Sequence, residues 1–235
     1  DIREYLARKP LLFDGGMGTY YKAAPGADCE MANLTDPEGV KKVHAEYLAA
    51  GAQAIKTNTF GLPRMAAAQM PGWEELAEAG WKLACDAAAE KDAAVFADFG
   101  PAPDTEAAPA SSAYGLVAQQ FAALGAKNFL FETLSSDVGI VEAVKALRVA
   151  VPDAFVMVSF AVLPDGYTRE GLLFRDLLRR MEQSGVVDAV GLNCVSAPGA
   201  MKKLVQSLGE TLLPLSVMPN AGYPVVTRAR VLYQG

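Results

Sequence analysis

The sequence contains few of the residues on which several classes of protein depend. Its 235 residues include three cysteines, Cys29, Cys85 and Cys194, and a single histidine, His44. Three scattered cysteines do not make the disulfide framework of a small secreted protein, so we expect reduced thiols and a cytoplasmic location. Because His44 falls in an early helical segment, a catalytic Cys–His pair is not expected either.

No stretch of the chain is basic enough or apolar enough to indicate a nucleic acid or a membrane as partner. The formal net charge is −6 and no block of Lys and Arg stands out, which argues against nucleic-acid binding. No run approaches the ~20 consecutive apolar residues of a membrane span, and the charged start of the chain lacks the apolar region of a signal peptide. Hydrophobic residues make up 51% and charged residues 20%, which is typical of a globular protein.

Short apolar runs alternate with helical patterns along the whole chain. We predict strands at 11–13, 52–60, 93–98, 128–133, 155–160, 189–192 and 215–220. We predict helices at 35–51, 76–92, 116–125, 172–184 and 201–208, a further helix capped by Ser135 or Ser136, a surface loop at 103–112 and a turn at 221–224. This alternation predicts a parallel sheet, either an open doubly wound sheet or a barrel, and a closed (β/α)8 barrel would need one strand more.

Polar residues close nearly every predicted strand. In parallel α/β sheets the carboxyl ends of the strands lie at one edge, where these folds carry their binding sites. A carboxylate or amide there can hold an amino acid's ammonium group, and a glycine-rich backbone can hold its carboxylate. With a single thiol among them, these residues suggest an amino-acid site beside an incomplete metal site. They are Asp14, Asn58, Asp98, Glu132, Asn193, Cys194 and Asn220, together with the turn at 15–19.

Three side chains admit more than one interpretation. Cys194 is either a packing residue, as most free cysteines are, or a zinc ligand facing a pocket. Lys56 is either an ion-paired lysine or the Schiff-base lysine of an aldolase, for which burial would lower its pKa. His44 lies on an apolar helix face, which favours a hydrogen-bonded core residue over a ligand.

Several short motifs occur along the chain in the order in which one enzyme family carries them. They are Asp14-Gly15-Gly16-Met17-Gly18-Thr19, Asn33-Leu34-Thr35, His44-x-x-Tyr47, Thr57-Asn58-Thr59-Phe60-Gly61, Phe131-Glu132-Thr133, Gly191-Leu192-Asn193-Cys194 and Pro219-Asn220-Ala221-Gly222-Tyr223-Pro224. As an ordered set, they resemble the homocysteine S-methyltransferase family. Segments 224–226 and 231–233 look most like the homocysteine module of bacterial bifunctional proteins that also carry a methylenetetrahydrofolate reductase module. The homocysteine-binding module of cobalamin-dependent methionine synthase is similar too.

This resemblance implies an α/β fold, a (β/α)8 TIM-type barrel that lacks its last strand here, with residues 1–235 as one domain. It implies zinc-dependent methyl transfer to the thiol of L-homocysteine, which yields methionine. In that family three cysteines hold zinc, and Cys194 matches the first of them. The other two belong to a later G-G-C-C motif, so we expect a full Zn2+ site, and activity, only with residues beyond Gly235.

The resemblance also assigns roles at the strand ends. Glu132 would hold the ammonium group of homocysteine, the glycine-rich backbone would hold its carboxylate, and the remaining polar side chains would orient the site. The substrate-binding residues expected in this way are Asp14, Gly16, Met17, Gly18, Thr19, Asn58, Glu132 and Asn193.

Some partners and two rival functions stay open at this point. The methyl donor could be a corrinoid that carries a methyl group from a methylated folate, S-methylmethionine or betaine. A C-terminal reductase or cobalamin module could follow. The rival functions are a Schiff-base aldolase that uses Lys56 and a non-catalytic module that binds a small molecule.

Overall fold

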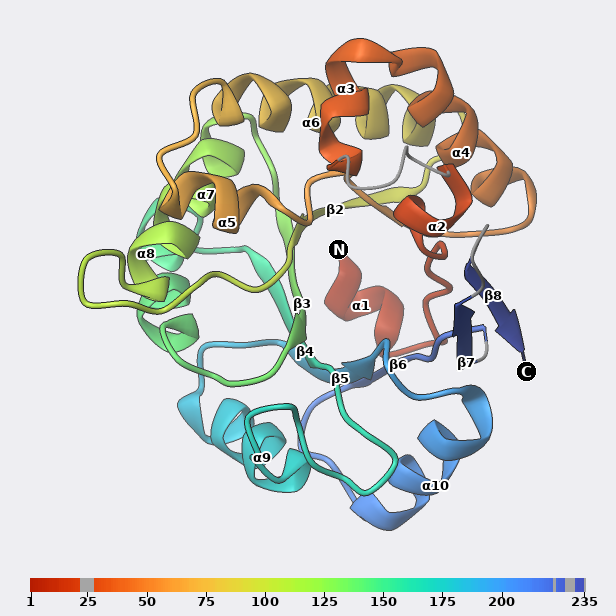
Figure 1. The fold of residues 1–235 in the computed structure, drawn as a ribbon, viewed down its shortest axis with the longest axis vertical. Coiled ribbons are helices and arrows are strands. Elements are labelled where there is room, and N and C mark those ends of the chain that lie inside the picture. The colour runs from red at the N-terminus through yellow and green to blue at the C-terminus, as the bar shows by residue number, and fades with distance from the viewer. Residues whose placement is uncertain (22–27, 222, 227–230, 235) are drawn as a thin grey trace.

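Six parallel strands curl into an open half-barrel with helices around its outer face (Figure 1). The computed structural model describes residues 1–21, 28–221, 223–226 and 231–234. The strands are β1 (Ala54–Lys56), β2 (Ala94–Phe99), β3 (Asn128–Leu134), β4 (Phe155–Phe160), β5 (Ala189–Asn193) and β6 (Leu215–Met218). They pair in chain order, β1 to β6, so each strand lies beside its predecessor in sequence.

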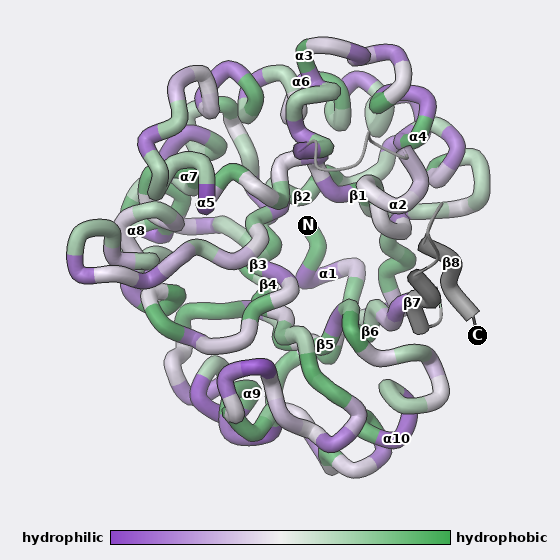
Figure 2. The backbone as a smooth tube through the Cα atoms, in the orientation of Figure 1, coloured by the Kyte–Doolittle hydropathy of each residue, from purple (hydrophilic) through white to green (hydrophobic). Residues whose placement is uncertain are grey.

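The first helices precede β1, and the helices from α5 (Leu62–Ala67) onwards lie in the connections between consecutive strands. The helices are α1 (Ile2–Leu6), α2 (Met17–Tyr21), the 3-10 turn η1 (Cys29–Met31), α3 (Ala32–Thr35), α4 (Pro37–Ala49), α5 (Leu62–Ala67), α6 (Trp73–Ala89), α7 (Ala110–Ala123), α8 (Ile140–Ala150), α9 (Phe174–Ser184) and α10 (Pro198–Leu208). Figure 2 shows hydrophobic residues along the central strands and hydrophilic ones spread over the surrounding helices. Among the described residues, none of these helices has the length and apolar character that a membrane span needs.

The inside of the half-barrel is closed at the end where the strands begin. Helix α1 lies within the curl (Figure 1), and its Ile2 and Leu6 pack against the apolar interior that Phe96 and Phe155 help to form. Arg3 anchors this helix, because its Nε donates to Asp188 Oδ1 at 2.9 Å, directly before β5. The opposite end, where the strands finish, is therefore the end that stays open to a ligand.

The alternation of strands and helices is confirmed, and β4 begins and ends at the predicted residues. The predicted strand 11–13 is wrong, because only Phe13 forms a bridge, to Ala54. The N–H of Leu12 donates to the Gln53 side chain at 3.0 Å instead of to a strand carbonyl. The sheet therefore carries one regular strand fewer than the seven predicted from the sequence.

Other predicted bounds also need correction, among them those of the strand 52–60, of which only Ala54–Lys56 is strand. Gly139, and neither Ser135 nor Ser136, precedes α8, and its φ of +77° is one that glycine adopts easily. The predicted loop at 103–112 is shorter, because α7 begins at Ala110 and buries that residue. The predicted turn at 221–224 is partly strand, since β7 (Tyr223–Val226) pairs antiparallel with β8 (Val231–Gln234), and Gly222 lies outside the described residues.

The short helices α1, α2, α3 and α5 are absent from the sequence prediction. Each has four to six residues, which is too short to show a helical period. Two of them, α1 and α2, contribute residues to the inner wall of the half-barrel. The positions of α2, α3 and α5 follow from packing against neighbouring helices and not from a local pattern.

Gly191→Ala should destabilise the fold, because β5 has no room for a side chain at this position. A Cβ there would lie 2.7 Å from Ser216 Cβ and 2.8 Å from the Ser216 carbonyl oxygen on β6. We expect the free energy of unfolding to fall by about 1–3 kcal/mol, measured by urea denaturation. Gly199→Ala in α10 is the matched control, since a Cβ there meets nothing within 4 Å, and equal stability of both variants would contradict the prediction.

Candidate functional site

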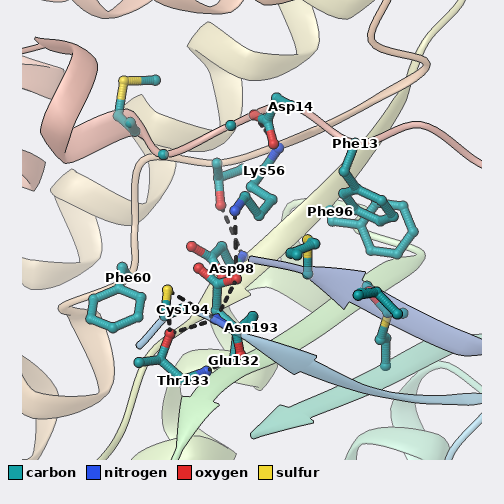
Figure 3. A pocket seen from close by; sticks show the side chains of 18 of the residues that line it. Phe13, Asp14, Lys56, Phe60, Phe96, Asp98, Glu132, Thr133, Asn193 and Cys194 are labelled. Carbon is teal, nitrogen blue, oxygen red and sulfur yellow. Dashed lines mark hydrogen bonds and ion pairs between the residues drawn. The ribbon is translucent and has the colours of Figure 1, made fainter. Parts of the chain in front are cut away.

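The carboxyl ends of the strands open into a cavity of about 890 Å³. Its inner part is apolar and reaches down to α1, whereas its outer part is polar. All the substrate-binding residues predicted from the sequence line this cavity, as do Cys194, Asp98 and Asn220. The structure thus brings these residues together, although their roles stay predictions. Figure 3 shows the polar side chains that form the group at the outer end, Asp14, Lys56, Asp98, Glu132, Thr133, Asn193 and Cys194.

The side-chain amide of Asn193 connects three strands at the centre of this group. Its Oδ1 accepts hydrogen bonds from the Thr133 N–H at 2.9 Å and from Ser159 Oγ at 2.8 Å. These two donors determine which way the amide points. Its Nδ2 therefore faces Thr133 Oγ1 at 2.7 Å, Cys194 Sγ at 3.3 Å and Glu132 Oε2 at 3.4 Å.

Cys194 and Thr133 both have backbone conformations that residues other than glycine rarely adopt. Their φ angles are +56° and +61°, in the left-handed region, where a non-glycine residue costs about 1–3 kcal/mol. The Thr133 hydroxyl donates to Cys194 Sγ at 3.6 Å. Burial raises the pKa of the Cys194 thiol, so without a bound cation the thiol stays protonated at neutral pH.

Lys56 is ion-paired inside the cavity. Its Nζ lies 3.5 Å from Glu132 Oε2, and the two side chains are 13% and 8% exposed. Burial by itself would lower the pKa of Lys56, but the charges of Glu132, Asp14 and Asp98 outweigh that effect and raise it. The expectation that burial lowers the pKa of Lys56, as a Schiff-base lysine would need, is therefore wrong. The geometry favours an ion-paired lysine.

Burial raises the pKa of two carboxyl groups near Lys56. Burial raises the pKa of Asp14 to about 7, against the opposing charge of Lys56, and it raises the pKa of Asp98 as well. Among the described residues, Asp14 Oδ1 and Asp98 Oδ1 are buried without a hydrogen-bond partner. The outer end of the cavity can therefore accept a further cation or proton.

Asn58 lines the cavity, but its side-chain amide donates hydrogen bonds to other residues of the chain. Its Nδ2 donates to the Cys29 carbonyl at 2.9 Å and to Asn33 Oδ1 at 2.9 Å. Asn58 thus ties η1 and α3 to the end of β1. Cys29 also lines the cavity, which its sequence context did not indicate, and burial raises the pKa of its thiol to about 11.

Sequence reasoning did not single out Ser159 or assign a role to Thr133. Ser159 lies in β4 opposite Gly191, the residue two before Asn193, and Thr133 follows Glu132 at the end of β3. Both residues carry a hydroxyl near the carboxyl end of a strand, and this position could have indicated from the sequence that they belong to the site. Cys85 is half-buried in α6 and does not line the cavity, which agrees with its predicted packing role.

A metal ion needs several donor side chains in one place. Among the described residues, no group of three or more His, Cys, Asp or Glu side chains is arranged to hold one. A zinc site usually takes three or four protein ligands, and the edge of the described sheet offers the single thiol of Cys194. The described residues by themselves therefore do not fit a zinc site.

Comparison with known proteins links the chain to one enzyme family. The family model described as homocysteine S-methyltransferase matches residues 11–233. The methionine synthase of Mycobacterium tuberculosis is 30% identical over 255 residues, which cover 96% of this chain and 21% of that protein. The homocysteine S-methyltransferase of Escherichia coli is 25% identical, over 90% of this chain and 78% of that protein. The chain thus spans about a fifth of the length of the methionine synthase.

A solved structure supports the fold. The homocysteine methyltransferase MmuM of Escherichia coli, in its metallated form, superposes with a TM-score of 0.76. The superposition covers 94% of this chain and 87% of that one at 24% identity. The likeness confirms an α/β fold of TIM-barrel type, of which the described residues form six parallel strands.

His44→Leu should reduce the acid sensitivity of the fold. His44 is buried, as predicted, but neither ring nitrogen has a hydrogen-bond partner among the described residues. Burial lowers the pKa of His44 to about 4 from 6.5, so the unfolded chain binds this proton first as the pH falls. The parent should lose up to about 3 kcal/mol of stability from this group between pH 6.5 and pH 4, a loss absent from the variant.

The measurement is the free energy of unfolding of both proteins in urea at intervals from pH 7 to pH 4. The difference between the two curves isolates His44 from the carboxylates, which titrate in both proteins. Parallel curves would show that His44 keeps its ordinary pKa in the folded chain.

Proposed function

The chain belongs to the homocysteine S-methyltransferase family, as its motifs indicated, and on that basis we propose that it binds L-homocysteine and methylates its thiol to give methionine. One observation carries the proposal. Glu132 and Cys194, the expected ammonium partner and the expected metal ligand, line one cavity, and both accept a hydrogen bond from Asn193 Nδ2, at 3.4 Å and 3.3 Å. A carboxylate and a thiol held by one amide suit a substrate that carries both an ammonium group and a sulfur.

Glu132 would bind the substrate ammonium group in this proposal. Its Oε2 has contacts with Lys56 and Asn193, and its Oε1 has no hydrogen-bond partner among the described residues. The backbone of Gly16, Met17, Gly18 and Thr19 lines the same cavity and would receive the substrate carboxylate. Because the pKa of Asp14 is raised to about 7, Asp14 would gain or lose a proton according to the charge of the bound substrate.

Cys194 is our candidate ligand for zinc. In this proposal the metal would keep the substrate thiol ionised at neutral pH, where a free thiol with a pKa of ~8.5 is mostly protonated. Asn193 and Thr133 hold the Cys194 sulfur in position. Because the described residues do not complete a zinc site, the contribution that we assign to them is binding and orientation.

We propose a class of methyl donors and not one compound. It is an electrophilic methyl group on a corrinoid supplied from a methylated folate, on S-methylmethionine or on betaine. The match to 21% of the length of a methionine synthase supports a further module that would deliver the methyl group. No contact of the described residues favours the aldolase, since Lys56 is ion-paired.

Glu132→Gln should weaken the binding of L-homocysteine on the order of tenfold to a hundredfold, because a neutral amide replaces the charged acceptor of the ammonium group. Titration calorimetry under reducing conditions measures the affinity. Glu142→Gln, an exposed change on α8, is the matched control and should bind like the parent. Equal affinity of the Glu132 variant and the parent would remove this residue from the substrate site.

In a protein that continues past Gly235, where the other two zinc cysteines are expected, Cys194→Ala should abolish methionine formation and lower the zinc content to background. Cys85→Ala, a change in α6 outside the cavity, should leave both unchanged. Product analysis and elemental analysis provide the two readouts. If the Cys194 variant keeps zinc and activity, the metal role is wrong. If parent and variants bind homocysteine but never methylate it, a non-catalytic binding module explains the chain better.

A further inference from the structure

The ammonium group of Lys56 lies where the proposed function places the ammonium group of the substrate. Its Nζ is 3.5 Å from Glu132 Oε2, and both side chains are nearly buried. Figure 3 shows Lys56 extending across the cavity towards Glu132, with Asp98 beside this contact. Without any substrate, the carboxylate expected to recognise an amino acid already has a cationic partner from the chain itself.

A second acceptor for the lysine lies close by. Asp98 is on β2, between β1, which carries Lys56, and β3, which carries Glu132. Its Oδ1 is buried and has no hydrogen-bond partner among the described residues. The charge of Asp98 acts on Lys56, and the four-carbon stem of a lysine turns easily between neighbouring acceptors.

Two ammonium groups cannot share the Glu132 carboxylate without mutual repulsion. An arriving amino acid must therefore either tolerate Lys56 or move it. The free oxygen of Asp98 offers the lysine a position that keeps it paired inside the cavity, whereas leaving it buried and unpaired would cost far more.

We propose that Lys56 competes with the ammonium group of the substrate for Glu132. In the empty site Lys56 pairs with Glu132, and it turns to Asp98 when an amino acid binds. This inference rests on the proposed function. While the site is empty, Lys56 keeps the Glu132 carboxylate paired. The affinity of the site for the amino acid is therefore lower than it would be without Lys56. Lys56 also reduces the ability of the site to distinguish a thiol that carries an α-ammonium group from one that lacks it.

The test compares two thiols that differ only in that group. L-homocysteine carries it, and 4-mercaptobutanoate is the same molecule without it. Titration calorimetry under reducing conditions measures the dissociation constants of both for the whole chain and for Lys56→Met, in which an uncharged, unbranched side chain fills the same space.

The variant should bind homocysteine on the order of tenfold more tightly than the parent does, because the competing charge is gone. Its affinity for 4-mercaptobutanoate should not change, so the ratio of the two dissociation constants widens. Lys82→Met is the matched control, since Lys82 is exposed and pairs with Asp86 on the surface of α6 at 2.6 Å. This control should leave both constants unchanged.

Asp98→Asn tests the second position with Lys56 in place, and it serves also if the Lys56 variant does not fold. Removing the charge that receives the lysine should weaken homocysteine binding and leave 4-mercaptobutanoate binding unchanged. Equal binding of homocysteine to this variant and to the parent would overturn the proposal.

The remaining outcomes separate this inference from the proposed function. If Lys56→Met weakens the binding of both thiols to the same extent, Lys56 holds the substrate carboxylate, and the competitor role is wrong. If it changes neither, Lys56 does not compete, and the proposal is again overturned. If the parent binds neither thiol, the proposed function itself fails, and the inference that rests on it fails as well.

Discussion

The side-chain amide of Asn193 holds the outer end of the cavity together. Its oxygen accepts hydrogen bonds from β3 and β4, at Thr133 and Ser159, while the residue itself ends β5. With the oxygen engaged in this way, the amide nitrogen must face Glu132 and the Cys194 sulfur. The left-handed backbone at Thr133 and Cys194 persists because these contacts over-determine it. Rotation of this one amide would therefore disturb the carboxylate and the thiol together.

Charge balance is the second constraint on the cavity. One lysine, Lys56, is surrounded by the carboxyl groups of Asp14, Asp98 and Glu132, all taken largely out of water. The surrounding negative charges outweigh the effect of burial on Lys56 and raise its pKa, whereas burial raises the pKa of Asp14 and of Asp98. A site of this kind can exchange one ammonium group for another without a large change in net charge. An amino acid, with its own ammonium group, fits that exchange.

Much of the fold follows from local patterns in the chain. The apolar run 155–160 is buried throughout, and it forms β4 with the predicted bounds. The strand predicted at 11–13 fails because the side chain of Gln53 takes the N–H that a strand would pair. The helices α1 and α5 were not predicted, since five or six residues are too few to show a period. Local pattern therefore sufficed for long, regularly buried elements and failed for short ones defined by their neighbours.

The sequence by itself determined the order of the six parallel strands and of the longer helices, and the polar residues at or just beyond the strand ends. From that order, the meeting of Glu132, Asn193 and Cys194 could be predicted, because parallel strands end at one edge of their sheet. Only the tertiary structure decided which groups these side chains contact. The ion pair of Lys56 joins residues 76 positions apart, and the Asn193 contact to the Thr133 N–H joins residues 60 positions apart. Such pairings depend on the distance between strands and on burial, which no local stretch of sequence contains.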